Sequence, residues 1–379
     1  MSMRWQAAIV KPGFNPLGTQ TSTTTYTGSI YSWGSNGAGQ LGLGNITDYS
    51  SPKQVGSLTA WLRLAGSYRA ILAIKSDNTL WSWGQNDIGF LGLGNLTYYS
   101  SPKQVGSLTN WSLASSGGES SAAVKTDGTL WTWGSGANGS LGLNNLTNYS
   151  SPKQVGALTN WSNCAVGQNF MVAVKTNGTL WSWGNNVVGQ LGLGNRTYYS
   201  SPKQVGLLTT WSTVYVGYKG MNAFAIKTDG SLWAWGQNLS GALGLGTLTK
   251  YSSPKQVGSL TNWASVGTNG DQSFSVKTDG TLWSWGRNNN GQLGLGNVTN
   301  YSSPKQVGAL TNWLTIASGL YHAVSIKTNT TLWTWGLNDN GQLGSGTRTK
   351  RSSPAQVGSL TNWAPIVIGL QYASLGVLY

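Results

Sequence analysis

The sequence is poor in the residues on which most enzyme chemistry depends. It contains one cysteine, one histidine and nine acidic residues among 379. The lone Cys164 excludes an internal disulfide framework and a cysteine-rich metal site. With a single histidine, neither a Ser-His-Asp triad nor an imidazole metal centre can be assembled from the repeats. These shortages favour a protein that is not an enzyme, and we expect it to need no metal and no cofactor.

Long apolar runs and charged residues are also scarce. No segment approaches the roughly 20 apolar residues of a membrane-spanning helix, so we expect no membrane insertion. Only 8% of the residues are charged, yet the net charge is +14. A positive potential of this size favours polyanions or acidic protein surfaces, or it serves only to keep the protein soluble. The sequence leaves both interpretations open.

What the chain has in abundance is repetition. The signature Trp-[Ser/Thr/Ala]-Trp-Gly occurs six times and is preceded by a variant copy, Tyr-Ser-Trp-Gly. Successive copies are 50 residues apart, except for one step of 52. A period of this size is typical of repeat architectures, in which one unit cannot bury its apolar face alone. The last tryptophans of the seven copies are Trp33, Trp83, Trp133, Trp183, Trp235, Trp285 and Trp335.

Each unit has the pattern of four short strands joined by turns. The segment Asp127-Gly128 predicts a two-residue hairpin turn, because such pairs supply the positive φ angles that this turn requires. In the strand that follows, Leu130 faces one side while Trp131 and Trp133 face the other. A sheet with two apolar faces needs a neighbour on each side, and a radial array provides both. We therefore predict an all-β, seven-bladed β-propeller of four-stranded antiparallel blades.

The two ends of the repeat region are complementary fragments of one blade. The last segment stops where a hairpin turn should follow, and the first segment begins just after that turn. We therefore predict that residues 373–378 pair with residues 29–33, so that the N- and C-terminal strands share a blade and close the ring. A solenoid would instead carry polar capping units. The predicted propeller spans residues 26–379.

Two irregularities are interpreted as local features. The 52-residue step places its two extra residues between Val216 and Phe224, which indicates a loop insertion that leaves the ring intact. The Asn-x-Thr triplets resemble glycosylation acceptors, but we interpret them as turn chemistry copied by duplication. They begin at Asn45, Asn95, Asn145, Asn195 and Asn297.

Residues 1–25 lie outside the period and are predicted to form an extended N-terminal arm. Its apolar side chains would be poor neighbours for solvent, so the arm either docks on another protein or a sister copy, or folds back along its own blades. The partner-binding candidates in the arm are Arg4, Trp5, Ile9, Lys11 and Phe14.

Two series of lysines repeat with the blades, so each series should form a ring. One series lies in Ser-Ser-Pro-Lys-Gln-Val, and the other directly precedes the hairpin turn. We predict that the second series is a basic partner-binding ring on the face that carries the turns. Its members are Lys75, Lys125, Lys175, Lys227, Lys277 and Lys327. The opposite face, rich in Asn, Gln, Ser and Tyr, suits protein or sugar partners.

The unit Asp-Gly-Thr-Leu-Trp-Ser-Trp-Gly followed by Gly-Gln-Leu-Gly resembles the repeat of the regulator of chromosome condensation family, from Tyr26 to Tyr379. The resemblance implies a seven-bladed propeller with a blade shared by both termini. For the founding eukaryotic member it implies guanine-nucleotide exchange on a small GTPase and chromatin binding, through acidic and histidine-bearing loops. Here only His322 keeps a histidine at the corresponding position.

The near-identity of the copies and the short arm are also similar to uncharacterised repeat proteins of bacteria and marine phages. Our leading hypothesis is a non-enzymatic structural or interaction propeller, a bacteriophage virion component in the capsid decoration, tail or fibre. It would be anchored to other virion proteins or sister copies by its arm, assembled in the host cytoplasm, and able to present a face to a host-surface glycan or protein. The alternative is a cytoplasmic propeller of the chromosome-condensation type, associated with chromatin or nucleic acid or regulating a GTPase.

Overall fold

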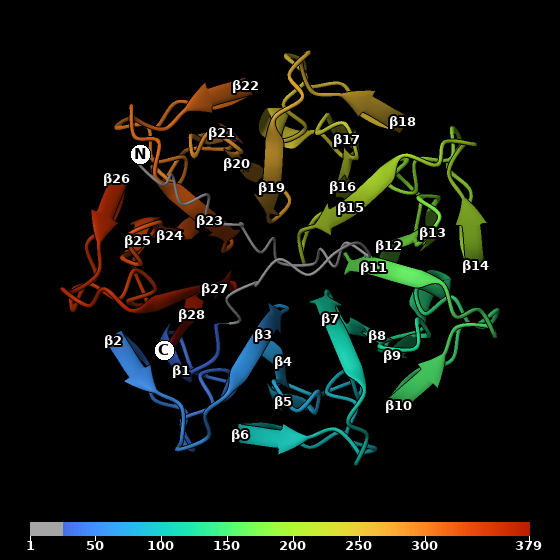
Figure 1. Ribbon diagram of the computed structural model, residues 1–379, viewed down its shortest axis with the longest axis horizontal. Coiled ribbons are helices and arrows are strands. Elements are labelled where there is room, and N and C mark those ends of the chain that lie inside the picture. The colour runs from blue at the N-terminus through green and yellow to red at the C-terminus, as the bar shows by residue number, and fades with distance from the viewer. Residues whose placement is uncertain (1–25) are drawn as a thin grey trace, which may run out of the picture.

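The computed structural model describes residues 26–379, which form a ring of seven four-stranded antiparallel sheets around a central axis (Figure 1). The predicted seven-bladed propeller is thereby confirmed. The arm residues Arg4, Trp5, Ile9, Lys11 and Phe14 lie outside the described residues, so their role stays a prediction.

Each blade contributes one strand to each of four positions, from the axis to the rim (Figure 1). The innermost strands are β3 (Trp61–Gly66), β7 (Trp111–Gly117), β11 (Trp161–Val166), β15 (Trp211–Val216), β19 (Trp263–Thr268), β23 (Trp313–Ser318) and β27 (Trp363–Gly369). The second strands are β4 (Ala70–Lys75), β8 (Ser120–Lys125), β12 (Phe170–Lys175), β16 (Asn222–Lys227), β20 (Gln272–Lys277), β24 (His322–Lys327) and β28 (Ala373–Leu378).

The third strands carry the tryptophan signature, and the outermost strands carry the Ser-Ser-Pro motif. The third strands are β5 (Leu80–Gly84), β9 (Leu130–Gly134), β13 (Leu180–Gly184), β17 (Leu232–Gly236), β21 (Leu282–Gly286), β25 (Leu332–Gly336) and β1 (Ser29–Gly34). The outermost strands are β6 (Tyr99–Gln104), β10 (Tyr149–Gln154), β14 (Tyr199–Gln204), β18 (Tyr251–Gln256), β22 (Tyr301–Gln306), β26 (Arg351–Gln356) and β2 (Tyr49–Gln54). Two single-turn 3₁₀ helices, η1 (Ala137–Gly139) and η2 (Leu239–Gly241), lie in the loops before β10 and β18.

The two ends of the chain complete one blade, as predicted. Its strand order is β2-β1-β28-β27, with β1 antiparallel to β28. The pairing register runs from Ser29 opposite Leu378 to Gly34 opposite Ala373. The rings of Tyr26 and Tyr379 then lie 5.1 Å apart. The molecule is therefore circular in space although its chain is linear.

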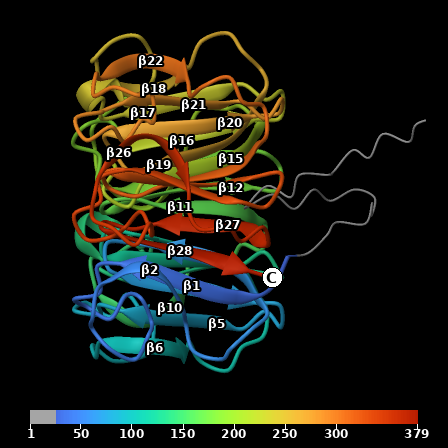
Figure 2. The same ribbon diagram turned by 90° about the vertical axis from the view of Figure 1, so that its left-hand side faces the viewer.

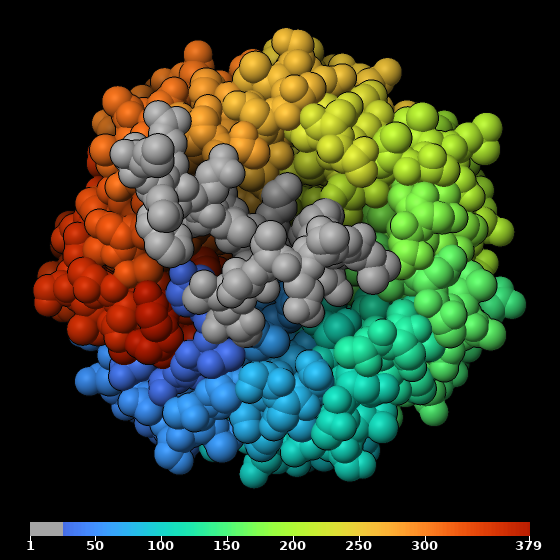
Figure 3. Space-filling view, in the orientation of Figure 1, coloured from blue at the N-terminus to red at the C-terminus, as the bar shows by residue number. Residues whose placement is uncertain are grey.

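The two faces of the ring differ in their connections. One face carries the turns between second and third strands, and the described chain both begins and ends there; we call it the terminal face, and it lies on the right of Figure 2. The other face carries the turns between first and second strands and the long loops between third and outermost strands; we call it the loop face. Figures 1 and 3 look onto the terminal face.

The turn that contains Asp127 and Gly128 differs from the predicted two-residue type. Gly128 has a positive φ of 76°, and Asp127 does not. The amide of Gly128 donates to the Lys125 carbonyl at 3.0 Å, and the amide of Lys125 donates to the Thr129 carbonyl at 3.0 Å. Three residues are therefore enclosed, and only the glycine must be left-handed. The Asp127 carboxylate instead accepts the amide and hydroxyl of Thr129, which lowers the pKa of that carboxyl.

The Asn-x-Thr triplets lie in the long loops and behave as turns. The Asn45 side-chain oxygen accepts a hydrogen bond from the Thr47 amide at 3.0 Å. The other four triplets repeat this contact at the same distance. An asparagine that bonds the backbone two residues on is a typical turn former, so the interpretation as turn chemistry is supported.

The core lies between blades, because each blade presents a leucine face to one neighbour and a tryptophan face to the other. Leu80 packs in a cluster with Trp133 of the next blade, and Leu130 packs in a cluster with Trp183 of the blade after that. All four side chains are fully buried. The predicted alternation of apolar faces is thus confirmed, and each cluster is formed only when two blades meet.

In six of the seven blades, a hydrogen bond from the signature tryptophan joins the blade to its neighbour, whereas the indole nitrogen of Trp335 has no partner among the described residues. The indole nitrogen of Trp133 donates to the Phe90 carbonyl of the preceding blade at 2.9 Å. Gly92 lies directly beneath, and a Cβ placed there would come within 2.8 Å of the indole nitrogen. The Gly-x-Leu-Gly motif is therefore where one blade receives the tryptophan of the next. Equivalent bonds are made by Trp33, Trp83, Trp183, Trp235 and Trp285.

We expect one blade to carry a correctable strain. Thr330 occupies the turn position of Gly280 in the preceding blade and has a φ of 59°, a region that β-branched residues avoid. Thr330→Gly should raise the free energy of unfolding by about 1 kcal/mol because it relieves this strain. The converse variant, Gly280→Thr, should lower it by at least as much. Denaturant unfolding of both variants checks the pair, and a destabilised Thr330→Gly would contradict the assignment.

Candidate functional site

The blades differ most from one another near the axis on the loop face. The outermost strands and the tryptophan signatures are almost invariant, whereas the segments from the first strand into the second share little beyond their apolar pattern. The turns between these strands, which we call the axial hairpins, converge around the axis. They comprise residues 67–69, 118–119, 167–169, 217–221, 269–271, 319–321 and 370–372.

The longest axial hairpin is the insertion predicted from the 52-residue step. Residues 217–221 join β15 to β16 and leave the ring intact. The carbonyl of Tyr218 accepts from the Gly118 amide at 2.9 Å, and its ring lies 6.3 Å from that of Tyr68. The Gly220 carbonyl accepts from the Gln168 amide at 3.4 Å. One hairpin thus contacts the hairpins of three other blades. Tyr218 is only 5% exposed, and burial raises the pKa of its hydroxyl well above the usual value.

Cationic side chains are held on aromatic rings around this insertion. The guanidinium of Arg69 lies 5.1 Å from the centre of the Tyr68 ring, and the Lys219 ammonium lies 5.0 Å from the same ring. Such cation–π contacts fix long side chains at little cost in hydration. The axial hairpins therefore present an ordered surface of tyrosine and cations that is unlike anything repeated around the ring.

An ion pair extends the same surface. Arg287 follows β21 and lies 3.4 Å from the Asp271 carboxylate, with both side chains 33% exposed. Its guanidinium also lies 5.2 Å from the Tyr321 ring. At this exposure the pair adds little to stability, but it places one more cation and one of the few acidic groups beside the axial hairpins.

His322, the one histidine, is part of the blade boundary rather than an exposed loop. It is fully buried, and its Nε2 lies 2.8 Å from the Ser374 hydroxyl. That hydroxyl donates to the Gln342 carbonyl at 3.0 Å, so it accepts the hydrogen of Nε2. Burial lowers the pKa of His322 to about 3. The imidazole is therefore neutral, and it links the blade of β23–β26 to the shared blade.

The pre-turn lysines lie on the terminal face, as expected, but against aromatic rings. The Lys125 ammonium lies 3.9 Å from the centre of the Trp131 ring and 5.0 Å from that of Trp111, and burial lowers its pKa. Lys175, Lys277 and Lys327 are likewise buried, whereas Lys75 and Lys227 are partly exposed. The structure thus assigns this ring a packing contact, and partner binding by the ring stays a prediction.

The exposed lysine belt is the series that sequence reasoning did not select. Each belt lysine lies in an outermost strand and covers the tyrosine that begins that strand, as Lys153 does at 5.5 Å from the Tyr149 ring. Side chains alternate between two faces along a strand, and an outermost strand has solvent on one side. This alternation was the signal that could have distinguished the exposed lysine series from the pre-turn series. The belt comprises Lys53, Lys103, Lys153, Lys203, Lys255 and Lys305, all exposed.

Comparisons with known proteins agree with this geometry. Residues 114–375 match the family model of the RCC1-like domain, and residues 27–73 and 77–124 match the regulator of chromosome condensation (RCC1) repeat. The chain belongs to the family of RCC1-like propellers. No curated protein sequence matches it.

Several solved structures share the fold of this RCC1-like propeller. Prp20p from Saccharomyces cerevisiae, described with its binding to Gsp1p and histones, gives a TM-score of 0.83 at 20% identity over 94% of this chain and 93% of its own. Yeast RCC1 (Prp20) in a complex with Kap60 gives 0.82 at 21% identity over 94% and 90%. Human WBSCR16 gives 0.80 at 20% identity over 93% and 100%.

Two further findings concern residues 26–379 of this propeller. None of their helices is long and apolar enough to cross a membrane. They contain no group of three or more His, Cys, Asp or Glu side chains placed to hold a metal ion.

We expect His322 to make the propeller sensitive to acid. Its pKa is about 3 when folded, below the ordinary value of 6.5, so the unfolded chain binds the proton more tightly. The contribution of the neutral imidazole to the free energy of unfolding is fully present above about pH 6.5. This contribution should fall as the pH drops toward 3. His322→Gln, which introduces the residue found at the equivalent Gln272, should flatten this part of the profile. Denaturant unfolding between pH 7 and pH 4 compares the two proteins, and parallel profiles would contradict the assignment.

Proposed function

We propose that this RCC1-like propeller is a non-enzymatic interaction protein that binds a small GTPase through its axial hairpins. The observation that carries the proposal is the break in symmetry. A single asymmetric partner requires an asymmetric surface, and in a ring of near-identical blades the differences gather at these hairpins. Tyrosine and arginine, the residue types that dominate the energy of protein interfaces, are both present there.

The class of partner is supported by the family. Prp20p shares the fold and is described as binding Gsp1p and histones. Nothing in residues 26–379 or in the comparisons supports a virion component. The alternative given in the sequence analysis, a propeller of the chromosome-condensation type, is therefore the better supported hypothesis. A cytoplasmic location, which the sequence analysis gave as the alternative to a virion, agrees with a GTPase partner.

Charge reversal at the axial hairpins tests this proposal. Arg69→Glu and Lys219→Glu should each weaken binding of GDP-loaded Gsp1p at least about tenfold, because an interface hot spot contributes ~2 kcal/mol or more and a tenfold change in affinity is ~1.4 kcal/mol. Titration calorimetry measures the affinity. Lys53→Glu and Lys103→Glu, which change exposed cations far from the axis, are matched controls and should bind like the parent. Failure of the parent to bind any small GTPase, or equal affinity in the hairpin variants, would contradict the proposal.

A second candidate function, association with nucleic acid, is favoured by the exposed lysine belt. The six belt lysines lie on six of the seven outermost strands, with Ala355 in their place on β26, and the described residues place no ion-pair partner on any of them. Such a belt suits the phosphate backbone of a nucleic acid that follows the rim, since phosphate contacts need only cations and no sequence-specific geometry.

Salt dependence tests this second candidate. Replacement of all six belt lysines by glutamine should weaken binding to duplex DNA and reduce the slope of log affinity against log salt by about 0.9 for each phosphate that is no longer neutralised. Lys75→Gln with Lys227→Gln, the partly exposed members of the pre-turn ring, is the control and should leave the slope unchanged. Filter binding over a salt series measures it. An identical slope in the parent and the belt variant would exclude the belt as the DNA-binding surface.

A further inference from the structure

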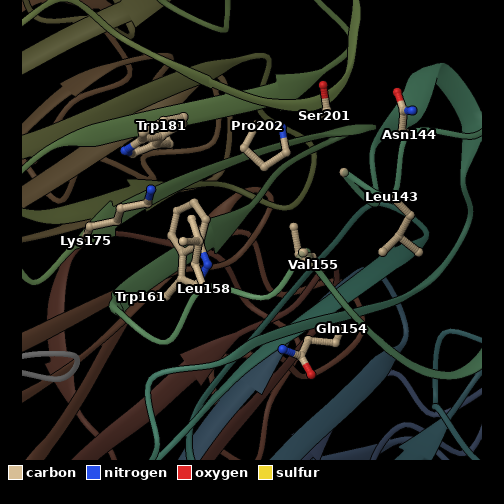
Figure 4. Close-up of a pocket in the computed structure, with 12 residues that line it drawn as sticks. Leu143, Asn144, Gln154, Val155, Leu158, Trp161, Lys175, Trp181, Ser201 and Pro202 are labelled. Atoms are coloured by element: carbon tan, nitrogen blue, oxygen red, sulfur yellow. The ribbon is translucent and has the colours of Figure 1, made fainter.

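The boundaries between blades contain pockets near the rim that neither proposed function uses. One pocket, of about 560 Å³, lies between the blade of β7–β10 and the blade of β11–β14 (Figure 4). A second, of about 350 Å³, lies between the blades of β15–β18 and β19–β22. The two are lined by the same positions of the repeat: Gln154, Leu158, Trp161, Trp181, Ser201 and Pro202 in the first correspond to Gln256, Leu260, Trp263, Trp283, Ser303 and Pro304 in the second.

Each pocket has an apolar floor formed by a buried tryptophan. Trp161 is only 2% exposed, and its indole nitrogen has no acceptor among the described residues. In Figure 4 this nitrogen is turned toward Val155 at the centre of the pocket. Trp263 in the second pocket has the same unpartnered donor. At the equivalent position Trp61 donates to the Leu58 carbonyl at 3.0 Å, and the indole nitrogens of Trp161 and Trp263 are fully buried. The floor therefore offers a ligand apolar surface rather than a hydrogen-bond donor.

The walls and mouth of the pocket define the ligand further. Trp181, Leu158 and Pro202 offer apolar surface, while Gln154 and Ser201 offer amide and hydroxyl groups at the mouth. No carboxylate lines either pocket. The Lys175 ammonium lies 3.8 Å from the centre of the Trp181 ring, so it is already engaged. The complementary ligand is neutral and amphipathic, with an apolar face and several hydroxyl groups.

We propose that the inter-blade pockets bind hexopyranose units of a glycan. A pyranose ring has an apolar C–H face that suits tryptophan and proline, and it carries hydroxyl groups that bond to amide and serine side chains. A pocket of about 560 Å³ lies within the usual range for small-molecule sites. The leucine at each mouth, 49% exposed at Leu158 and 46% at Leu260, would be covered by the bound sugar.

Repetition makes weak pockets effective. Two equivalent pockets on one rigid ring engage a polymeric glycan at once, so the second contact forms at a high effective concentration. The expected signature is weak binding of single sugars together with firm retention on a polysaccharide of the same sugar. This activity is independent of the axial hairpins, since the pockets lie at the rim.

Removal of the polar mouth of both pockets tests the proposal. The variant Gln154→Ala, Ser201→Ala, Gln256→Ala, Ser303→Ala changes partly or fully exposed side chains and should fold like the parent, as circular dichroism and thermal melting will verify. Methyl hexopyranosides of glucose, mannose, galactose and N-acetylglucosamine are the probes, with saturation-transfer NMR and calorimetry as readouts. The variant should bind two fewer sugars per chain than the parent. Its retention on the matching polysaccharide should fall about tenfold or more.

Controls separate this proposal from the GTPase proposal. Lys219→Glu alters an axial hairpin and should leave sugar binding unchanged, whereas the pocket variant should bind Gsp1p like the parent. No binding of any of the four glycosides by the parent would overturn the proposal. Equal sugar stoichiometry in the parent and the pocket variant would also overturn it. So would the finding that a proline-rich peptide, and no sugar, occupies the pockets.

Discussion

The packing of one tryptophan into the next blade is the constraint on which the whole ring depends. A four-stranded sheet of this composition has two apolar faces, so no blade is stable until a neighbour covers each of them. The signature tryptophan fills the contact, and in six of the seven blades it also donates to a backbone carbonyl of the preceding blade. At the junction of the chain ends, Trp33 donates to the Gln342 carbonyl at 2.9 Å, and Gly346 donates to the Ser50 carbonyl at 2.8 Å. Closure therefore uses the same contacts as the other boundaries and requires no special device.

This constraint divides the sequence into fixed packing positions and free surface within a single chain. Gly92 has to remain glycine because the indole of Trp133 lies against it, and equivalent positions recur around the ring. The axial hairpins differ among blades while the tryptophan contacts at the boundaries are kept, although Gly167 and Gly217 in these hairpins also lack room for a Cβ. Residues 217–221 show the result: two added residues reach three other blades, yet the register of β15 with β16 is kept. The candidate partner surface lies where the repeats differ most in sequence.

Charge shows where sequence reasoning reaches its limit. The two lysine series have the same period and the same count, so neither property separates them. Folding places Lys125 between two tryptophan rings, whereas Lys153 remains on the rim. The distinction arises because the innermost tryptophan, Trp111, approaches Lys125 from the neighbouring strand, as the pairing of Trp111 with Lys125 shows. His322 is a similar case, since the side chain that it bonds, Ser374, lies 52 residues away in the sequence.

The sequence by itself determined the number of blades, the strand pattern of each and the sharing of one blade by the two ends, because periodic apolar faces admit few other arrangements. It also located the insertion. Only the tertiary structure decided that the aspartate turns enclose three residues, that most pre-turn lysines are covered, and that the variable hairpins meet around the axis. It alone formed the inter-blade pockets, whose walls come from two blades and exist in neither separately. Local propensity and period are properties of neighbouring residues, whereas burial, convergence and pockets depend on which distant segments pack together.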